Sequence, residues 1–233
     1  MKSVSIIVTL FFLPFSVSAG TFVETFDDED LQDWQDITMV NLDAAQAAWE
    51  VIDDELQGMS QAPLVSLLTI GDKTWQDYTV EFDVKPTKKH GPGSIAIAAR
   101  KKKTWIVTCM IGDMKFPAPE SRATCFSGDF HENRYVVIKW EAVPLLTLET
   151  WSHLKLSVHD TTFTLWINGK QVLEARDQEA KFLTGGVGFG IANYTAKFDN
   201  LVISGDSIPN KGRLSVTPKD KLATIWGKLK VNP

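Results

Sequence analysis

The sequence has little of several things, and each shortage excludes a class of protein. Among 233 residues there are two cysteines and four histidines, with no Cys-x-x-Cys pair, so a structural zinc site is not supported. Acidic residues outnumber basic ones, 29 against 24, which argues against binding to nucleic acid. No apolar stretch after residue 19 reaches the roughly 18 residues that a membrane-spanning helix needs. A Gly-x-Ser-x-Gly motif is also missing, so the sequence gives no support for a serine-type triad.

Residues 1–19 have the pattern of an export signal. Lys2 gives a positive start, an apolar run follows, and Val17 and Ala19 are the small residues of a cleavage site before Gly20. We therefore expect a secreted, periplasmic or cell-surface protein once the signal is removed.

The two cysteines, Cys109 and Cys125, both lie in the mature chain. In an exported protein we expect them to form a disulfide, and two reduced, buried thiols are the alternative. Closing a loop of this size would stabilise the fold by roughly 3 kcal/mol.

Residues 20–204 have β-strand patterns almost throughout. In residues 78–85 aromatic and β-branched residues alternate with polar ones, which is typical of a strand with one buried face. Asn168-Gly169 stands between two further alternating runs and predicts a two-residue hairpin. The many short strands with turn signals predict an all-β, two-sheet antiparallel jelly-roll sandwich.

The C-terminal part differs from this β pattern. Residues 205–216 are interpreted as a linker, and residues 217–233 are predicted to form a short amphipathic helix with Pro218 in its first turn. The apolar stripe of that helix comprises Leu222, Ile225, Trp226 and Leu229.

Several short motifs follow one another in a fixed order along residues 21–204. They are Phe22 to Trp34, Trp49-Glu50-Val51 with Leu56, Trp75 to Phe82, Trp151 to Val158, Asn168-Gly169, Gly186-Val187-Gly188 and Phe198-Asp199-Asn200. This order resembles the concanavalin A-like lectin/glucanase superfamily, nearest to laminin-G-like and 3-keto-disaccharide hydrolase-type domains. The resemblance implies the sandwich fold, but lectins, enzymes and adhesion modules share it, so it does not select one function.

Two hypotheses of function follow from the resemblance. The first is a carbohydrate-binding or adhesion module. The second is a glycosidase-type hydrolase that acts on keto-disaccharides or glucans, with Glu81, Asp83 and Arg100 as its site. The related glucanases carry Glu-x-Asp-x-Glu on one strand face, and here Lys85 stands in place of the third carboxylate. Glu81 and Asp83 can instead be surface carboxylates that pair with Lys85 or Arg100.

Four residues are candidates for contacting a glycan. An arginine fork can hold sugar hydroxyls or a carboxylate, and indole rings can stack on sugar faces. The alternatives are an ion pair for Arg100 and core packing for the tryptophans. The candidates are Arg100, Trp105, Trp140 and Trp166.

A calcium ion is the one cofactor that the sequence suggests. Glu24 and Asp27 lie near the start of the sandwich and Asp199 near its end, and first and last strands are often neighbours in such folds. Carboxylate oxygens suit Ca²⁺. The alternative is that Asp27 and Asp199 bond to the backbone of turns.

Overall fold

The computed structural model describes residues 19–27, 31–39, 47–115, 117 and 120–212. In these residues it contains strands and turns but no helix, which confirms the predicted all-β antiparallel sandwich. Nor does this part of the chain contain a helix long and apolar enough to span a membrane. The predicted helix over 217–233 and residues 1–18 of the predicted signal lie outside the described residues.

Most strands have the short lengths typical of sandwiches, and two are much longer. The strands are β1 (Gly20–Glu24), β2 (Gln35–Thr38), β3 (Ala48–Ile52), β4 (Glu55–Met59), β5 (Ser66–Ile70), β6 (Tyr78–Lys102), β7 (Trp105–Gly112), β8 (Arg122–Asp129), β9 (Arg134–Ala142), β10 (Ser152–His159), β11 (Thr162–Ile167), β12 (Lys170–Arg176), β13 (Gly186–Gly205) and β14 (Lys211–Gly212).

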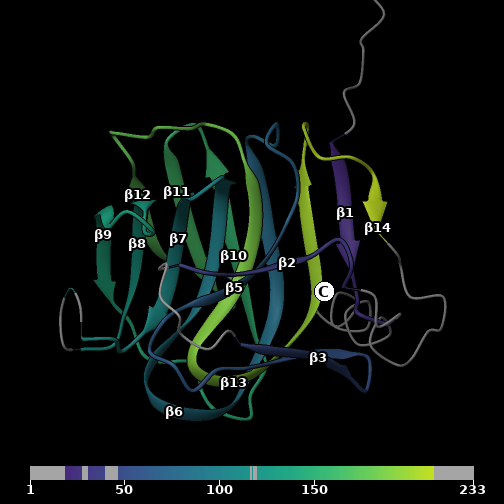
Figure 1. The fold of residues 1–233 in the computed structure, drawn as a ribbon, viewed down its shortest axis with the longest axis vertical. Helices are drawn as coiled ribbons and strands as arrows, with labels where there is room; N and C mark the ends of the chain where they lie inside the picture. The colour runs from purple at the N-terminus through teal and green to yellow at the C-terminus, as the bar shows by residue number, and fades with distance from the viewer. Residues whose placement is uncertain (1–18, 28–30, 40–46, 116, 118–119, 213–233) are drawn as a thin grey trace, which may run out of the picture.

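The long strands β6 and β13 pair with each other and run through both layers of the sandwich (Figure 1). At one end of this pair the neighbours form the order β12-β11-β10-β6-β13-β1-β14, which we call the first sheet. At the other end β6 carries β7, β8 and β9, and β13 carries β5 and β2; we call this the second sheet. The change from one sheet to the other occurs around residues 86–93 of β6, where the register with β13 shifts.

Side-chain alternation decides which residues enter the core. From Tyr78 to Val84 every second residue is at most 2% exposed, and the residues between them are partly exposed, as the sequence pattern predicts. These side chains face inward residues of the second sheet, including Ile95, Ile97 and Val107. The main core therefore lies between the two sheets, and Glu81 and Asp83 lie on the outer face of the first sheet.

The central strands β6, β7 and β8 of the second sheet are buried on both faces, whereas the edge strand β9 is largely exposed. Ala96, Ala98, Ile106 and Phe126 belong to a second apolar cluster on the outer face of this sheet, which Met39 helps to cover. This explains why strand β6 reads as continuously buried from Ser94 to Arg100 instead of alternating.

The predicted disulfide between Cys109 and Cys125 is present and joins facing positions of β7 and β8. The predicted linker, in contrast, begins as part of the sandwich. Ile208 is 4% exposed in the core, and β14 pairs in parallel with β1. Burial of this isoleucine fixes residues 205–212 against the first sheet.

Candidate functional site

The outer face of the first sheet carries a compact group of charges around His153. Its Nδ1 lies 2.9 Å from Asp83 Oδ1, and its Nε2 lies 3.6 Å from Glu81 Oε2. Strand register brings them together, because His153 stands directly opposite Asp83 in the β10–β6 pair. Lys155 Nζ lies 3.7 Å from the same Glu81 oxygen, and Asn200 Nδ2 donates to Asp83 Oδ2 at 2.8 Å.

These contacts shift the acid–base properties of the group. Hydrogen bonds to Asp83 and then Glu81 raise the pKa of His153 to about 9, so the ring is charged at neutral pH. In return, chiefly through the hydrogen bond from His153, the pKa of Glu81 is lowered. A carboxylate held in its charged form is a poor general acid.

The two carboxylates of the predicted hydrolase site are thus engaged by neighbours other than those expected. Among the described residues, neither carboxylate forms an ion pair with Lys85 or Arg100; the partners are His153 and Lys155 from β10 and Asn200. Lys85 instead places its ammonium 4.8 Å from the centre of the Trp151 ring. Glu81 and Asp83 side chains are 29% and 28% exposed on an open sheet face.

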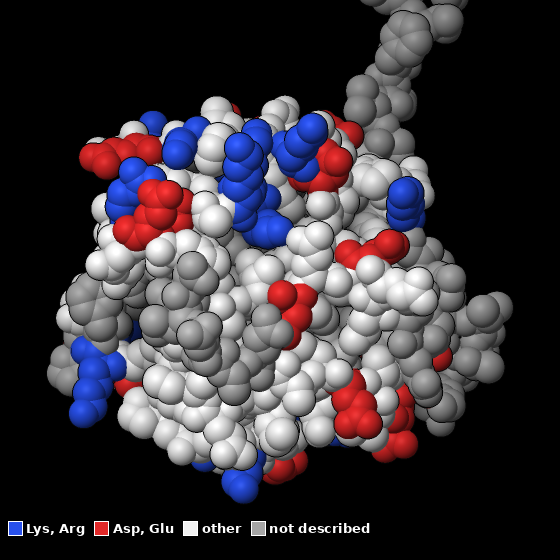
Figure 2. Space-filling view, viewed as in Figure 1, with Lys and Arg blue, Asp and Glu red and all other residues white. Residues whose placement is uncertain are grey.

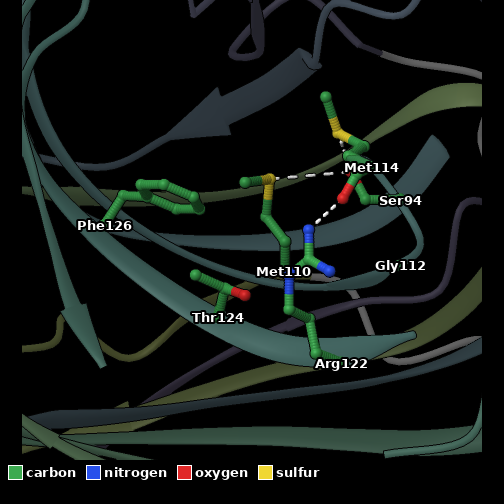
Figure 3. Close-up of a pocket in the computed structure, with 7 residues that line it drawn as sticks. All are labelled: Ser94, Met110, Gly112, Met114, Arg122, Thr124 and Phe126. Atoms are coloured by element: carbon green, nitrogen blue, oxygen red, sulfur yellow. Dashed lines mark hydrogen bonds between the residues drawn. The ribbon is translucent and has the colours of Figure 1, made fainter. Parts of the chain in front are cut away.

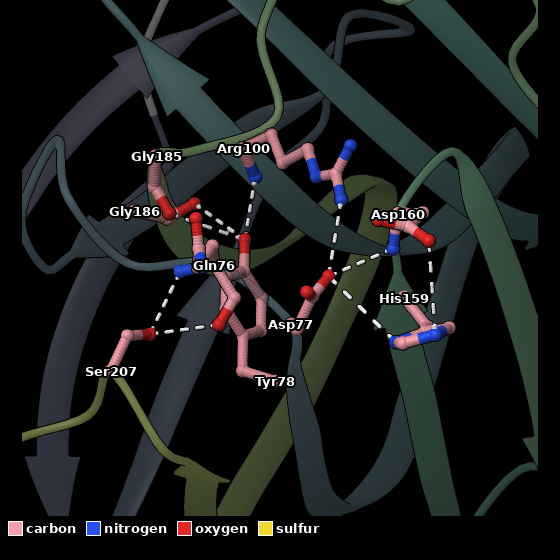
Figure 4. A network of polar contacts seen from close by, with 9 residues as sticks. All are labelled: Gln76, Asp77, Tyr78, Arg100, His159, Asp160, Gly185, Gly186 and Ser207. Atoms are coloured by element: carbon pink, nitrogen blue, oxygen red, sulfur yellow. Dashed lines mark hydrogen bonds and ion pairs between the residues drawn. The ribbon is translucent and has the colours of Figure 1, made fainter.

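Arg100 is fully buried at the end of strand β6 (Figure 4). Its backbone N–H donates to the Tyr78 hydroxyl at 2.8 Å, its guanidinium lies 3.8 Å from Asp77 Oδ1, and it packs on the Phe163 ring. Burial lowers the pKa of Arg100, and nearby Asp77 is among the groups that oppose the shift. The residue faces the interior at the end of the sandwich, so its partner is Asp77 rather than a carboxylate of the outer face.

The three candidate tryptophans lie in three different places. Trp140 is 40% exposed on β9, opposite Thr124. Trp166 is on the outer face of the first sheet, where Lys155 Nζ lies 5.8 Å from its ring centre. Trp105 begins β7 and packs edge-on against Phe182. The structure therefore does not gather them into one platform.

The outer face of the second sheet offers little space among the residues described. Its hollow, shown in Figure 3, holds only about 10 Å³. Met110 and Met114 fill it, and the Ser94 hydroxyl lies 3.6 Å and 3.5 Å from their sulfurs. Arg122 hydrogen-bonds the backbone carbonyls of Glu120 and Met114 beside it. A single water needs about 10–15 Å³ of such space, so the hollow admits no sugar ring.

A larger cleft of about 320 Å³ lies where the ends of the two sheets meet. The second sheet contributes the starts of β7 and β9 and the end of β8, and the segment after β12 supplies the rest; β12 packs against β9 here. The cleft is lined by Trp105, Ser127, Arg134, Tyr135, Val136, Asp177, Glu179 and Lys181. Its volume falls at the lower end of the range for small-molecule sites.

Within the described part of the chain, two polar atoms in the wall of this cleft have no hydrogen-bond partner. Ser127 is 1% exposed and Asp177 is 3% exposed. Among the residues that the structure describes, neither Ser127 Oγ nor Asp177 Oδ2 has a hydrogen-bond partner. A buried polar group without a partner is costly, by about 1–3 kcal/mol, so solvent or a ligand is expected to supply the missing bonds.

Sequence reasoning selected Trp105 in this cleft and missed the other lining residues. For two of the missed residues, Ser127 and Asp177, the sequence does contain a pattern that indicates an inward-facing polar side chain. Ala123 and Cys125 point into the core, and Ser127 continues their alternation; Asp177 likewise follows Leu173 and Ala175. Both are polar residues that continue the inward alternation of a strand after apolar residues, Ser127 within β8 and Asp177 just beyond the end of β12. Recognising them requires the strand register, which the sequence alone leaves open.

Each of the three carboxylates of the predicted calcium site accepts a hydrogen bond from a residue close to it in the sequence. Glu24 Oε1 accepts from the Phe26 N–H, Asp27 Oδ2 accepts from the Thr25 hydroxyl, and Asp199 Oδ1 accepts from the N–H of the next residue. The described residues contain no group of three or more His, Cys, Asp or Glu side chains placed to hold one metal ion. Calcium binding stays a prediction.

Comparisons with solved structures show the same fold in carbohydrate-related proteins. The carbohydrate-binding module CBM66 from Bacillus subtilis is 20% identical, with a TM-score of 0.56 over 72% of this chain and 93% of that one. A Bacillus subtilis protein of unknown function with a galectin-like fold is 14% identical, with a TM-score of 0.57 over 79% and 96%. Domain 4 of AbnA, an arabinanase from Geobacillus stearothermophilus solved with arabinotriose, is 14% identical, with a TM-score of 0.52 over 82% and 95%. At these identities the likeness establishes the fold alone.

No curated protein matches the chain. One family does, and it covers the sandwich from its first strand to the end of β13. The match runs over residues 21–204, so the chain belongs to the family described as the 3-keto-alpha-glucoside-1,2-lyase-like domain.

Proposed function

We propose that this protein is an exported carbohydrate-binding domain that holds its glycan in the cleft between Trp105 and Asp177. The observation that carries the proposal is the pairing, in one cleft, of partnerless buried polar atoms with aromatic side chains. Sugars present hydroxyl groups at their edges and apolar C–H faces, and this cleft offers a match for each.

The polar part of the match involves Ser127 and Asp177. A carboxylate oxygen can accept from a sugar hydroxyl, and the serine hydroxyl can donate or accept. Asp177 Oδ1 already accepts from the Glu179 N–H at 3.2 Å, but Asp177 Oδ2 and Ser127 Oγ are buried without a hydrogen-bond partner among the described residues. A sugar hydroxyl would complete the bonds that these two atoms leave unmade. Hydrogen bonds to a charged acceptor are stronger than neutral ones.

The apolar part involves Trp105 and Tyr135, both of which line the cleft. Tyr135 is fixed by a stacked contact with Phe130, at 4.6 Å between ring centres, and Trp105 is fixed by Phe182. Rings that are already held in place lose little conformational freedom when a ligand binds.

The direct test is a panel of soluble glycans, including arabinotriose, glucan oligosaccharides and a keto-disaccharide, measured by calorimetry against the mature protein. Binding of at least one glycan, lost in Trp105→Ala and kept in Trp166→Ala, would support the proposal. Trp166→Ala is the matched control because it removes an indole from the outer face of the first sheet. Binding that survives Trp105→Ala but not Trp166→Ala would move the site to that face.

The second candidate is a glycosidase-type enzyme on keto-disaccharides or glucans, and the family description favours it. Its carboxylate would be Asp177 in the cleft, because Glu81 and Asp83 are engaged by His153 on an open face. Incubation with a 3-keto-disaccharide, followed by chromatography of the products, tests this. Cleavage abolished by Asp177→Asn, with Glu81→Gln still active, would establish the enzyme.

Export is the remaining part of the proposal. It is supported by the signal pattern at residues 1–19 and by the disulfide, since disulfides persist in oxidising compartments. Intact-mass measurement of protein recovered from the producing cell tests it, with a chain that starts near Gly20 as the expected result. The predicted calcium binding is tested separately, by comparing the thermal unfolding temperature with and without a chelator.

A further inference from the structure

Three lysines lie at or near the cleft although the chain as a whole is acidic, with a formal net charge of −5. Lys181, in the segment after β12, lines the cleft, and Lys102, at the end of β6, shares the Phe182 ring with it. Lys103 follows in the turn to β7, where it lines a separate small hollow. We call these three residues the basic rim. The space-filling view shows several Lys and Arg side chains at the upper end of the molecule, with Asp and Glu side chains among them (Figure 2).

Aromatic rings hold two of these ammonium groups in place. Lys181 Nζ lies 5.4 Å from the centre of the Trp105 ring and 5.5 Å from that of Phe182. Lys102 Nζ lies 4.9 Å from the Phe182 ring and 3.2 Å from the Thr184 hydroxyl. Phe182 therefore fixes charges that come from two separate segments, beside the ring that lines the cleft.

The basic rim is not neutralised by the protein. Elsewhere Lys89, Lys139, Lys155 and Lys197 each lie within ion-pair distance of a carboxylate. None of the three rim lysines has such a pair within the described part of the chain, and Lys181 and Lys103 are exposed. Fixed, unpaired cations at the mouth of a cleft attract anionic ligands.

The acidic groups of the cleft occupy a different position. Asp177 is buried in the wall, and Glu179 follows it two residues later. A ligand that suits both regions has neutral hydroxyls where it enters the cleft and negative charges where it leaves. A polysaccharide with uronate or sulfate groups along its chain has this chemistry.

From this arrangement we infer that the glycan is an anionic polysaccharide, whose sugar ring enters the cleft while its carboxylate or sulfate groups contact the basic rim. The inference rests on the proposed function and narrows it to a ligand class. Carboxylate and sulfate share the charge that the rim recognises, and the experiment separates them.

Two matched pairs of polymers provide the test: polygalacturonate against its methyl ester, and dextran sulfate against dextran. Each pair keeps the sugar backbone and changes the charge. We expect at least one anionic member to bind about tenfold more tightly than its neutral counterpart at about 0.05 M salt, and to lose most of that advantage at about 0.5 M. The pair that shows the difference identifies the anionic group.

The variant Lys102→Gln/Lys103→Gln/Lys181→Gln should lose about tenfold in affinity for that polymer. Lys88→Gln/Lys170→Gln/Lys211→Gln is the matched control, because it removes the same charge from exposed lysines away from the cleft. Thermal unfolding verifies that both variants are folded. Equal losses in the two variants would mean general attraction to the whole surface and would overturn the inference.

The remaining outcomes separate this inference from the proposed function. If neutral glycans bind and neither anionic polymer does, the ligand class is wrong and the binding function stands. If a neutral counterpart binds as tightly as its anionic partner, the basic rim has no role. If no glycan binds under any condition, both proposals fall.

Discussion

Two polar regions of this molecule differ in whether their groups already have partners. On the outer face of the first sheet, Asp83 is bonded by His153 and by Asn200. In the cleft, Ser127 Oγ and Asp177 Oδ2 are buried and, within the described residues, lack partners. A satisfied cluster stabilises the fold and has no vacant hydrogen-bonding site. Where a buried polar atom without a partner borders a cleft, a ligand can gain free energy by supplying the missing hydrogen bond.

The largest expected effect concerns the cross-link behind the cleft. Replacing both Cys109 and Cys125 by Ala should lower the free energy of unfolding by about 3 kcal/mol, because the unfolded chain regains the freedom of the 16-residue loop. Urea denaturation measures this loss, and titration of thiols in the unreduced protein provides the control. Two reactive thiols after denaturation would show that the bridge does not form in the native protein.

A smaller effect is expected on binding when the cleft loses its indole. Trp105→Ala should weaken glycan binding by about 2 kcal/mol, roughly thirtyfold, because central aromatic contacts dominate interface energies. Trp140→Ala removes an exposed indole from β9 and should leave the affinity unchanged, as calorimetry can establish. An equal loss in the two variants would place the ligand across the β9 edge instead.

The difference between the cleft and the outer face of the first sheet can be tested with one variant in each region, measured for both affinity and stability. Asp177→Asn should cost about tenfold in glycan affinity while the free energy of unfolding changes little, since Asn keeps the oxygen that accepts from the Glu179 N–H, and Asp177 Oδ2 has no hydrogen-bond partner among the described residues. Asp83→Asn should do the reverse, lowering stability by about 1 kcal/mol and leaving affinity intact. If Asp177→Asn destabilises the protein more than Asp83→Asn, the two regions have been assigned the wrong roles.

The smallest effect is the pH dependence of the outer face. Because the folded pKa of His153 is raised to about 9, its stabilisation is complete below the ordinary pKa near 6.5 and is lost as the pH rises through 9. The side chain is 45% exposed, and solvent screening limits the loss to about 1 kcal/mol. Urea denaturation at pH 6 and at pH 10, in wild type and His153→Gln, measures it. A variant with the same pH dependence as wild type would assign the loss to another group.

The sequence predicted the fold well because the information was local. Alternation at Tyr78–Val84 placed the buried face, and the compartment suggested the disulfide before any register was known. The candidate site was harder to predict from the sequence, because its residues come from β7, β8, β9 and the segment after β12. Only Trp105 was predicted as a site residue. The partners of Glu81 and Asp83 depend on the pairing of β10 with β6, which brings His153 next to them.

The pairing of β6 with β13 has a consequence for how the chain folds. Strand β6 ends at Lys102 and β13 begins at Gly186, so the central ladder of both sheets joins two segments that are far apart in the sequence. During synthesis the ribosome makes β6 well before β13. Until β13 emerges, β6 lacks the partner that lies beside it in both layers, and folding dominated by such distant contacts is slow. The central ladder can therefore be completed only after Gly205 has been made, which suits the export that we propose, because export across a membrane favours a chain that has not yet folded.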